Sequence, residues 1–254
     1  MTPAAHELVA PPAWRDVEFI SDLHLQASQP ATVAAWRAYM QGVRADALFI
    51  LGDLFEAWIG DDSAAEPGFE AECAQVLHAT AQRLPVFFLH GNRDFLLGSA
   101  MAERSGLQLL PDPTVFTFGA TRWLLSHGDA LCLDDVDYQA FRKQVRNPAW
   151  QAAVLARPLA ERRMMAKALR SESENLKRGD TVYADVDHPA ALTWLEAARA
   201  DHLLHGHTHR PGEQAMAAQH RRIVLSDWDA EAQPPRAEAL RLNRDGGIRR
   251  IALA

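Results

Sequence analysis

Five short polar clusters each follow an apolar run in this 254-residue chain, and this repeated order limits the folds that it can adopt. The apolar runs span residues 17–20, 47–51, 86–89, 123–125 and 203–204. The clusters that follow them are Asp22-Leu23-His24, Gly52-Asp53, Gly91-Asn92-Arg93-Asp94, His127-Gly128-Asp129 and His205-Gly206-His207-Thr208-His209. Strands that lie side by side would bring all five clusters to one edge of a sheet. The sequence therefore predicts a single pocket rich in carboxylate, carboxamide and imidazole groups.

The apolar pattern between the clusters predicts helices over residues 31–43 and 69–83. Alternation of strands and helices implies parallel strands with helices on their faces, and such sheets bind ligands beyond the carboxyl ends of the strands. Residues 114–129 predict a hairpin and so a more antiparallel second half, which strands within 222–228 and 247–253 would complete. We expect residues 1–16, which show little periodicity, to form a mobile lead-in.

A segment without strand character, residues 137–180, separates the two halves. Its last forty residues hold ten Lys or Arg against four Asp or Glu, whereas the whole chain has a net charge of -7. Pro148 and Pro158 should divide the segment into shorter helices. Two interpretations remain open: a helical hairpin with a solvated face, or a basic amphipathic lid that meets an acidic or lipidic ligand.

Composition restricts the partners and the setting of the protein. The acidic overall balance argues against a surface that grips nucleic acid, because phosphate binding needs net positive faces. The two cysteines, Cys73 and Cys132, are far apart in the chain and favour a reducing compartment over a disulfide framework. The sequence shows neither a secretory signal nor an apolar stretch long enough to cross a membrane, so we expect a soluble or surface-bound protein.

The residue types in the clusters are those that bind divalent metal ions. Asp22 and His24 lie two residues apart, so on an extended chain their side chains point the same way. Asp53 follows a glycine and has two oxygens, which allows one carboxylate to bridge two ions. A mixed set of oxygen and nitrogen donors favours Mn, Fe, Co or Zn over Ca. Each cluster alone is more often a loop or a turn, and only their conjunction indicates a metal centre.

Taken in order, the clusters resemble the five motifs of the calcineurin-like metallophosphoesterases from Phe19 to about Trp228. The resemblance implies an α/β sandwich of two mixed β-sheets flanked by helices, with a helical lid insertion. The core would comprise residues 17–136 and 181–254, with the lid at 137–180 and an N-terminal extension at 1–16. The wording of "FLHGNRDFLLG" and "HGHTHRP", and the basic insertion, are similar to the diphosphatases of lipid A synthesis.

This resemblance implies two divalent ions, usually manganese, that activate a bridging water. The ligands that it implies for the first ion are Asp22, His24, Asp53 and His209, and those for the second are Asp53, Asn92, His127 and His207. The hydroxide would attack the α-phosphorus of a UDP-diacylglucosamine lipid and release UMP. Arg93 would neutralise charge on the diphosphate, with Asn92 and Asp53 also catalytic, and Asp94 would orient Arg93 or a histidine.

The same resemblance implies a lipid-linked UDP-sugar as the partner. The implied substrate contacts are Asn92, Arg93, Asp135, Ser171, Asn175, Lys177, Arg178 and His207. Apolar lid residues would line a groove for two acyl chains, and the basic face of the lid would attract an anionic membrane surface. We therefore expect a monomer bound peripherally to the cytoplasmic face of the inner membrane, with no nucleic acid as partner.

Two alternatives remain. The first is another dinuclear-metal phosphoesterase, such as a nucleotide pyrophosphatase or phosphodiesterase, which would not need apolar lid residues such as Trp150, Leu155, Met164 and Met165. The second is a metal-free scaffold for docking proteins. Such a scaffold should lack some ligands, whereas all seven implied positions are occupied here by residues able to bind metal.

Overall fold

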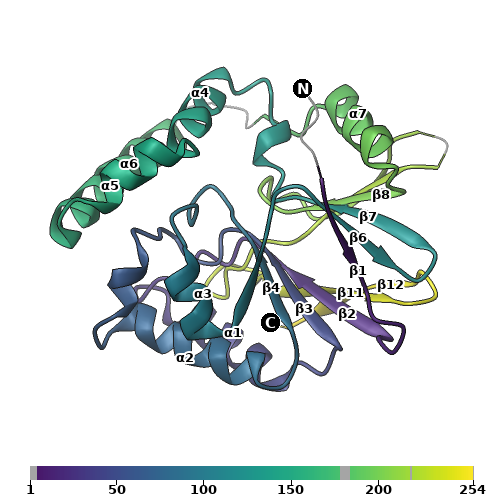
Figure 1. Ribbon diagram of the computed structural model, residues 1–254, viewed down its shortest axis with the longest axis horizontal. Coiled ribbons are helices and arrows are strands. Elements are labelled where there is room, and N and C mark those ends of the chain that lie inside the picture. Colours follow the sequence, from purple (N-terminus) through teal and green to yellow (C-terminus); the bar gives the residue numbers. More distant parts are fainter. Residues whose placement is uncertain (1–4, 178–183, 218, 254) are drawn as a thin grey trace.

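In the part of the chain that the structure describes, two β-sheets of six strands each form the centre of the protein (Figure 1). The computed structural model describes residues 5–177, 184–217 and 219–253, with side chains of helix α6 described as far as residue 169. One sheet contains β1 (His6–Val9), β6 (Thr114–Phe118), β7 (Thr121–Leu125), β8 (His202–His205), β10 (Arg221–Val224) and β9 (Gly212–Ala215), in that spatial order. The other contains β12 (Ile248–Ala252), β11 (Glu238–Asn243), β2 (Asp16–Ile20), β3 (Ala47–Leu51), β4 (Val86–Leu89) and β5 (Leu107–Leu110).

Helices cover the outer faces of the two sheets. The covering helices are α1 (Pro30–Gly42), α2 (Phe69–Ala81), α3 (Ser99–Ser105) and α7 (His188–Ala198). Figure 1 shows α1, α2 and α3 on one side of the paired sheets and α7 on the opposite side. Buried residues of α1 and α2 pack against the β2–β5 sheet, and Leu195 of α7 packs against Leu124 and Leu203 of the other sheet. The expected sandwich of two mixed sheets flanked by helices is confirmed.

The strands that carry the clusters are parallel to their neighbours. Within one sheet β2, β3 and β4 run parallel, and within the other β7 runs parallel to β8. Their carboxyl ends therefore lie at one edge of each sheet, where the polar loops begin. The hairpin predicted for residues 114–129 is also present, as the antiparallel pair β6 and β7.

Stacked phenylalanines fill the space between the sheets. The ring of Phe49 lies 4.8 Å from that of Phe19, 4.7 Å from that of Phe87 and 4.7 Å from that of Phe116, measured between centroids. Phe19, Phe49 and Phe87 come from adjacent parallel strands at matched register, and Phe116 comes from the opposite sheet. This apolar contact fixes the distance and the angle at which the two sheets face each other.

Three expectations about the sheets are wrong. The second half is not more antiparallel than the first, because among the described residues each sheet contains three parallel and two antiparallel strand pairs. Residues 6–9 do not form a mobile lead-in but the edge strand β1, which is parallel to β6. Its side chains are largely exposed, so the strand has no apolar alternation that would reveal it in the sequence. Residues 248–252 form β12, which pairs with β11 beside β2 and so belongs to the first half, whereas β10 joins the second half as expected.

The described residues of the insertion form three helices, α4 (Val136–Val145), α5 (Pro148–Leu155) and α6 (Leu159–Lys177), which Figure 1 shows projecting from the sheets. Pro148 is the first residue of α5, and Pro158 directly precedes α6, which confirms the predicted division into shorter helices. Arg162 of α6 is almost fully buried and contacts the Asp62 carboxylate and the Ile59 carbonyl. The insertion is thereby fixed to the loop after β3.

The Phe49→Ala substitution should lower the free energy of unfolding by about 3–5 kcal/mol, because it leaves a cavity between the two sheets. Denaturant unfolding followed by circular dichroism measures this difference. Val9→Ala is the matched control: Val9 is 67% exposed, and its loss should cost within about 0.5 kcal/mol. An equal effect of the two substitutions would contradict the role assigned to the phenylalanine stack.

Candidate metal centre

Backbone hydrogen bonds hold the loops after β2 and β3 side by side. Asp22 N–H donates to the Gly52 carbonyl at 3.1 Å, His24 N–H to the Asp53 carbonyl at 3.0 Å and Leu25 N–H to the Leu54 carbonyl at 2.9 Å. The pairing of the strands thus continues into the loops, and it places the first two clusters next to each other.

The candidate ligands have unusual backbone conformations. Among the described residues other than glycine, six have a positive φ. Five of the six are candidate ligands, namely Asp22, His24, Asp53, His207 and His209, with φ between 48° and 66°. Left-handed backbone is costly for such residues and concentrates at functional sites, where the surrounding structure imposes it. The strain indicates that these loops are shaped by the site and not by chain stability.

Glycines of the motifs allow the loops to approach closely. A Cβ on Gly91 would lie 2.0 Å from Asp53 Oδ1, and a Cβ on Gly206 would lie 2.2 Å from Asp22 Oδ2. Gly52 has a φ of 88°, and a Cβ there would lie 2.6 Å from His127 Nδ1. Each glycine therefore makes room for a candidate ligand from another cluster.

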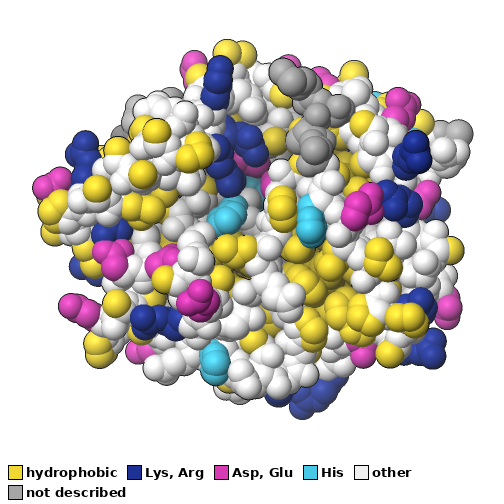
Figure 2. All heavy atoms as spheres, viewed as in Figure 1, with side chains coloured by type: hydrophobic (Ala, Val, Ile, Leu, Met, Phe, Trp, Pro, Cys, Tyr) yellow, Lys and Arg dark blue, Asp and Glu magenta, His cyan; other side chains and the backbone are white. Residues whose placement is uncertain are grey.

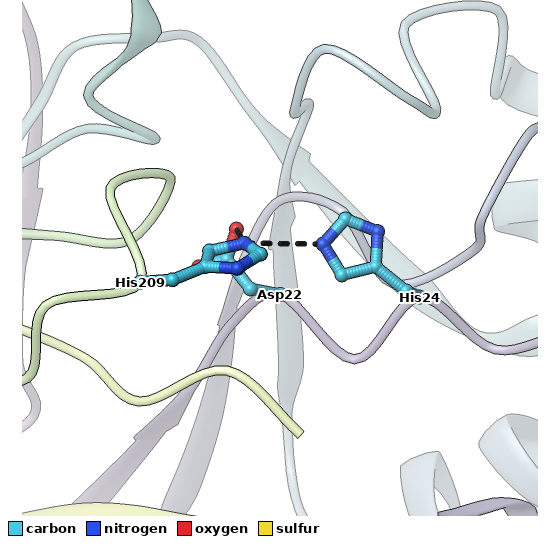
Figure 3. Close-up of side chains that lie close together, drawn as sticks. All are labelled: Asp22, His24 and His209. Carbon is cyan, nitrogen blue, oxygen red and sulfur yellow. Dashed lines mark hydrogen bonds and ion pairs between the residues drawn. The ribbon is translucent and has the colours of Figure 1, made fainter. Parts of the chain in front are cut away.

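Asp22, His24 and His209 converge on one point (Figure 3). The Nε2 atoms of the two imidazoles lie 3.3 Å apart, and His209 Nε2 lies 3.4 Å from Asp22 Oδ1. Asp22 Oδ1 is buried and has no hydrogen-bond partner among the described residues. A buried carboxylate oxygen that faces two imidazole nitrogens fits a bound divalent cation, which would satisfy all three atoms.

A second group of side chains adjoins the first. His127 Nε2 lies 3.7 Å from Asp53 Oδ2 and 3.0 Å from Asn92 Oδ1, and His207 Nδ1 lies 2.9 Å from the same amide oxygen. Asp53 Oδ2 also lies 3.9 Å from His24 Nε2. Because Asp53 faces both groups, its carboxylate is placed to bridge two ions.

Hydrogen bonds from the backbone orient these side chains. His127 Nδ1 donates to the Leu51 carbonyl at 2.8 Å, which leaves the lone pair on its Nε2 for the site. Arg93 N–H donates to Asp53 Oδ1 at 2.8 Å, so the other oxygen of Asp53 is directed towards the two groups. His207 N–H donates to Asp22 Oδ2 at 2.8 Å and leaves Asp22 Oδ1 facing the histidines.

The pKa values show that the pocket favours positive charge at one point. Burial lowers the pKa of His127, but the carboxylates of Asp53, Asp22 and Asp129 outweigh it and raise that pKa to about 9. Burial together with the charge of His127 lowers the pKa of His207 to about 4. Without a bound ion the carboxylates thus retain a proton on one imidazole, and a divalent cation would meet the same electrostatic demand.

Asp94 has a role that the sequence analysis assigned wrongly. Its carboxylate is fully buried and accepts hydrogen bonds from the backbone N–H groups of Asp53, Leu54 and Gly91. Burial and the neighbouring Asp53 raise its pKa to about 7. Asp94 therefore joins the second and third clusters through their backbones and does not orient Arg93 or a histidine.

Three acidic residues near the site have contacts that the sequence did not predict. Asp129 is buried and accepts hydrogen bonds from Tyr138 at 2.5 Å and from Arg142 at 2.8 Å, which connects α4 to the fourth cluster. Asp227 Oδ2 lies 3.8 Å from His209 Nδ1, and Glu56 Oε2 lies 3.2 Å from His24 Nδ1. Asp227 follows the apolar strand β10, so the pattern that revealed the five clusters contained a signal for this sixth acid.

The predicted substrate contacts are described only in part. Arg93 lies beside the site, with Nη1 3.7 Å from Glu56 Oε1, and Asp135 is the exposed N-cap of α4, where it accepts from Tyr138 N–H. Ser171, Asn175 and Lys177 belong to α6 in the part whose side chains are not described, and Arg178 lies outside the described residues. Figure 2 shows histidine side chains reaching the surface below the insertion, with Lys and Arg side chains near them.

The fold and the two groups of candidate ligands together define the class to which the protein belongs. The family model of the calcineurin-like phosphoesterases matches residues 17–211, and the chain belongs to this family. Family membership implies divalent metal ions, and the two groups of candidate ligands agree with it. The protein is thus a metal-dependent phosphoesterase.

The curated relatives of this chain have names more specific than that of the family. The chain is 43% identical over 251 residues to a protein of Xanthomonas campestris pv. campestris, which covers 92% of this chain and 98% of the relative. It is 46% identical over 246 residues to a protein of Chromobacterium violaceum, covering 93% and 98%, and 43% identical over 234 residues to one of Bordetella pertussis, covering 89% and 91%. All three relatives are named UDP-2,3-diacylglucosamine hydrolase.

The Gly91→Ala substitution should abolish binding of divalent metal, because the added methyl group would lie 2.0 Å from Asp53 Oδ1 and 2.4 Å from the Asp53 backbone nitrogen and would displace this candidate ligand. Titration calorimetry of the metal-depleted protein with Mn²⁺ measures the loss, and circular dichroism should show an unchanged fold. Gly42→Ala is the matched control, since a Cβ there meets nothing within 4 Å. Full metal binding by Gly91→Ala would refute the close approach as a requirement of the site.

Proposed function

We propose that this protein hydrolyses the diphosphate of UDP-2,3-diacylglucosamine and releases UMP and 2,3-diacylglucosamine 1-phosphate. The observation that carries the proposal is the convergence of Asp22, Asn92 and His207 from distant parts of the chain: His207 N–H donates to Asp22 Oδ2 at 2.8 Å, and His207 Nδ1 lies 2.9 Å from Asn92 Oδ1. The names of the curated relatives support the substrate. Another dinuclear phosphoesterase or a metal-free scaffold is not favoured by these relatives.

The seven candidate ligands would hold two divalent ions, which we propose to be Mn²⁺. Asp22, His24 and His209 would hold the first ion, and Asn92, His127 and His207 the second, with Asp53 shared by both. When bound, the ions polarise the phosphate and lower the pKa of a water molecule.

Side chains around the metal ions would have the remaining catalytic and substrate-binding roles. Arg93 is half-buried, with Nη1 3.7 Å from Glu56 Oε1, and from there its guanidinium would neutralise charge on the diphosphate as UMP leaves. Asn92 and His207 would contact the α-phosphate together with the metal. Asp135 would bind the sugar from the start of α4.

We further propose that residues 137–180 are a lid and that residues 17–136 and 181–254 form the catalytic core. Trp150 and Met165 pack towards the core, and the Trp150 ring lies 6.1 Å from that of Phe95. Leu155, Met164 and Leu169 are exposed, at 41%, 65% and 43%. These exposed apolar side chains would contact the acyl chains, with Ser171, Asn175, Lys177 and Arg178 supplying polar contacts to the substrate.

We propose that the protein is a monomer that binds peripherally to the cytoplasmic face of the inner membrane. The basic face of the lid supports binding to an anionic membrane surface. None of the helices in the described ranges is long and apolar enough to span a bilayer. Lys143, Arg163 and Lys167 of the lid are exposed, and each basic residue near an anionic surface contributes roughly 1 kcal/mol to binding.

The Asp53→Ala variant should release UMP from UDP-2,3-diacylglucosamine and Mn²⁺ more than about 100-fold more slowly than the wild type. The loss should exceed the 10- to 100-fold typical of residues outside the ligand shell, because both ions lose a ligand. Chromatographic measurement of UMP gives the rate, and the exposed Asp245→Ala is the control at wild-type rate. Undiminished turnover by Asp53→Ala would exclude its bridging role.

The same assay separates the proposal from its rivals. Wild-type protein that hydrolyses nitrophenyl phosphates but not the lipid would favour another phosphoesterase. Purified protein that binds no transition metal would favour the scaffold, whereas about two equivalents support the dinuclear site.

Binding to vesicles that contain anionic lipid should weaken as salt is raised from 0.05 to about 0.5 M, because salt screens the basic lid. Sedimentation of the protein with the vesicles measures the bound fraction. The double substitution Arg163→Glu and Lys167→Glu should reduce binding at low salt, whereas a change of Arg249 to Glu, in β12, should have little effect. Equal sedimentation at both salt concentrations would disprove electrostatic attachment.

A further inference from the structure

Glu56 lies between a candidate metal ligand and the arginine of the third cluster. Its Oε2 lies 3.2 Å from His24 Nδ1, and its Oε1 lies 3.7 Å from Arg93 Nη1. The Glu56 side chain is only 15% exposed. One carboxylate therefore faces both a residue of the first metal group and the residue proposed to contact the diphosphate.

The backbone holds Glu56 in this position. Leu25 and Phe55 form an isolated parallel bridge, and Glu56 N–H donates to the Leu25 carbonyl at 3.2 Å. Trp58 N–H donates to the Arg93 carbonyl at 2.9 Å. The segment that carries Glu56 is thus paired with the chain after His24 on one side and with the chain at Arg93 on the other.

We propose that Glu56 is a positioning residue that orients His24 for the first metal ion and holds the Arg93 guanidinium beside it. This inference rests on the metal and phosphate roles given under the proposed function. A carboxylate that accepts the Nδ1 proton of a histidine fixes its tautomer and leaves the lone pair of Nε2 for the metal. His24 Nε2 is the atom that faces His209 at 3.3 Å.

The opposite histidine provides a comparison within the same site. His209 Nδ1 also faces a carboxylate, that of Asp227, but at the longer distance of 3.8 Å. Asp227 is already bound by Arg236, whose Nη2 lies 2.9 Å from Asp227 Oδ2. The closer carboxylate is therefore the one on His24, and Glu56 should contribute more to metal affinity than Asp227.

The first test is the affinity of the metal-depleted protein for Mn²⁺ in the absence of substrate, measured by titration calorimetry. Glu56→Ala should weaken the binding of Mn²⁺ at the more strongly affected site by about 10- to 100-fold, the range typical of carboxylates that hydrogen-bond a metal ligand. Asp227→Asn should weaken Mn²⁺ binding less. Glu56→Gln keeps an acceptor oxygen and should recover part of the affinity. Glu72→Ala is the matched control, because Glu72 pairs with Arg37 on the surface of α2.

The second test separates the two contacts of Glu56. Arg93→Ala should leave the Mn²⁺ affinity unchanged and impair turnover of the UDP-lipid. Glu56→Ala should impair both, and saturating Mn²⁺ should restore only the part of the loss that comes from metal binding. Adding Glu56→Ala to Arg93→Ala should then cost little further turnover at saturating Mn²⁺, because the guanidinium that Glu56 holds is absent.

The outcomes distinguish this inference from the proposed function. Folded Glu56→Ala protein, judged by circular dichroism, with wild-type Mn²⁺ affinity would overturn the role of Glu56 towards His24. Fully additive losses in the double variant would overturn its role towards Arg93. Wild-type protein that binds Mn²⁺ but releases no UMP would instead refute the proposed function, while the Mn²⁺ titrations would still decide the role of Glu56.

Discussion

The hydrogen bond from His207 N–H to Asp22 Oδ2, which joins loops of the two sheets, is the contact on which the arrangement of the first group of candidate ligands depends. It joins residues 185 positions apart in the chain and aims Asp22 Oδ1 at the histidines. Gly206 permits it, since any side chain there would strike Ser21 and Asp22. The phenylalanine stack around Phe49 packs between the same two sheets and so helps to set how closely their edges approach.

The centre is costly to build, and its components compensate one another. Left-handed backbone at the ligand positions and several buried carboxylates both oppose folding. Backbone N–H groups offset part of this cost, as the three hydrogen bonds to Asp94 illustrate. A divalent cation would offset more, because it meets the carboxylates and the neutral imidazoles at once. Most of the left-handed backbone outside glycine thus lies at the candidate ligands, where metal chemistry needs it.

The insertion is attached to the same loops that form the centre. Arg142 binds Asp129 of the fourth cluster, and Arg146 Nη2 donates to the Gly91 carbonyl at 2.9 Å. Arg162, near the start of α6, fixes that helix to the loop after β3. Substrate contacts that the insertion supplies would therefore have a defined position relative to the metal ions, because the anchors are buried or partly buried ion pairs and backbone contacts.

The amino-acid sequence alone predicts the alternation of strands and helices, the division of the insertion at Pro148 and Pro158, and the set of polar clusters after the strands. These features are local: each depends on apolar periodicity or on residues next to one another in the chain. It did not reveal β1 or the place of β12, because edge strands with exposed side chains lack alternation and their pairing is set by distant partners. The folded structure was needed to show that Asp94 binds three backbone N–H groups and that Glu56 lies between His24 and Arg93. The physical reason is that such contacts depend on how two loops approach in space, which no spacing along one loop encodes.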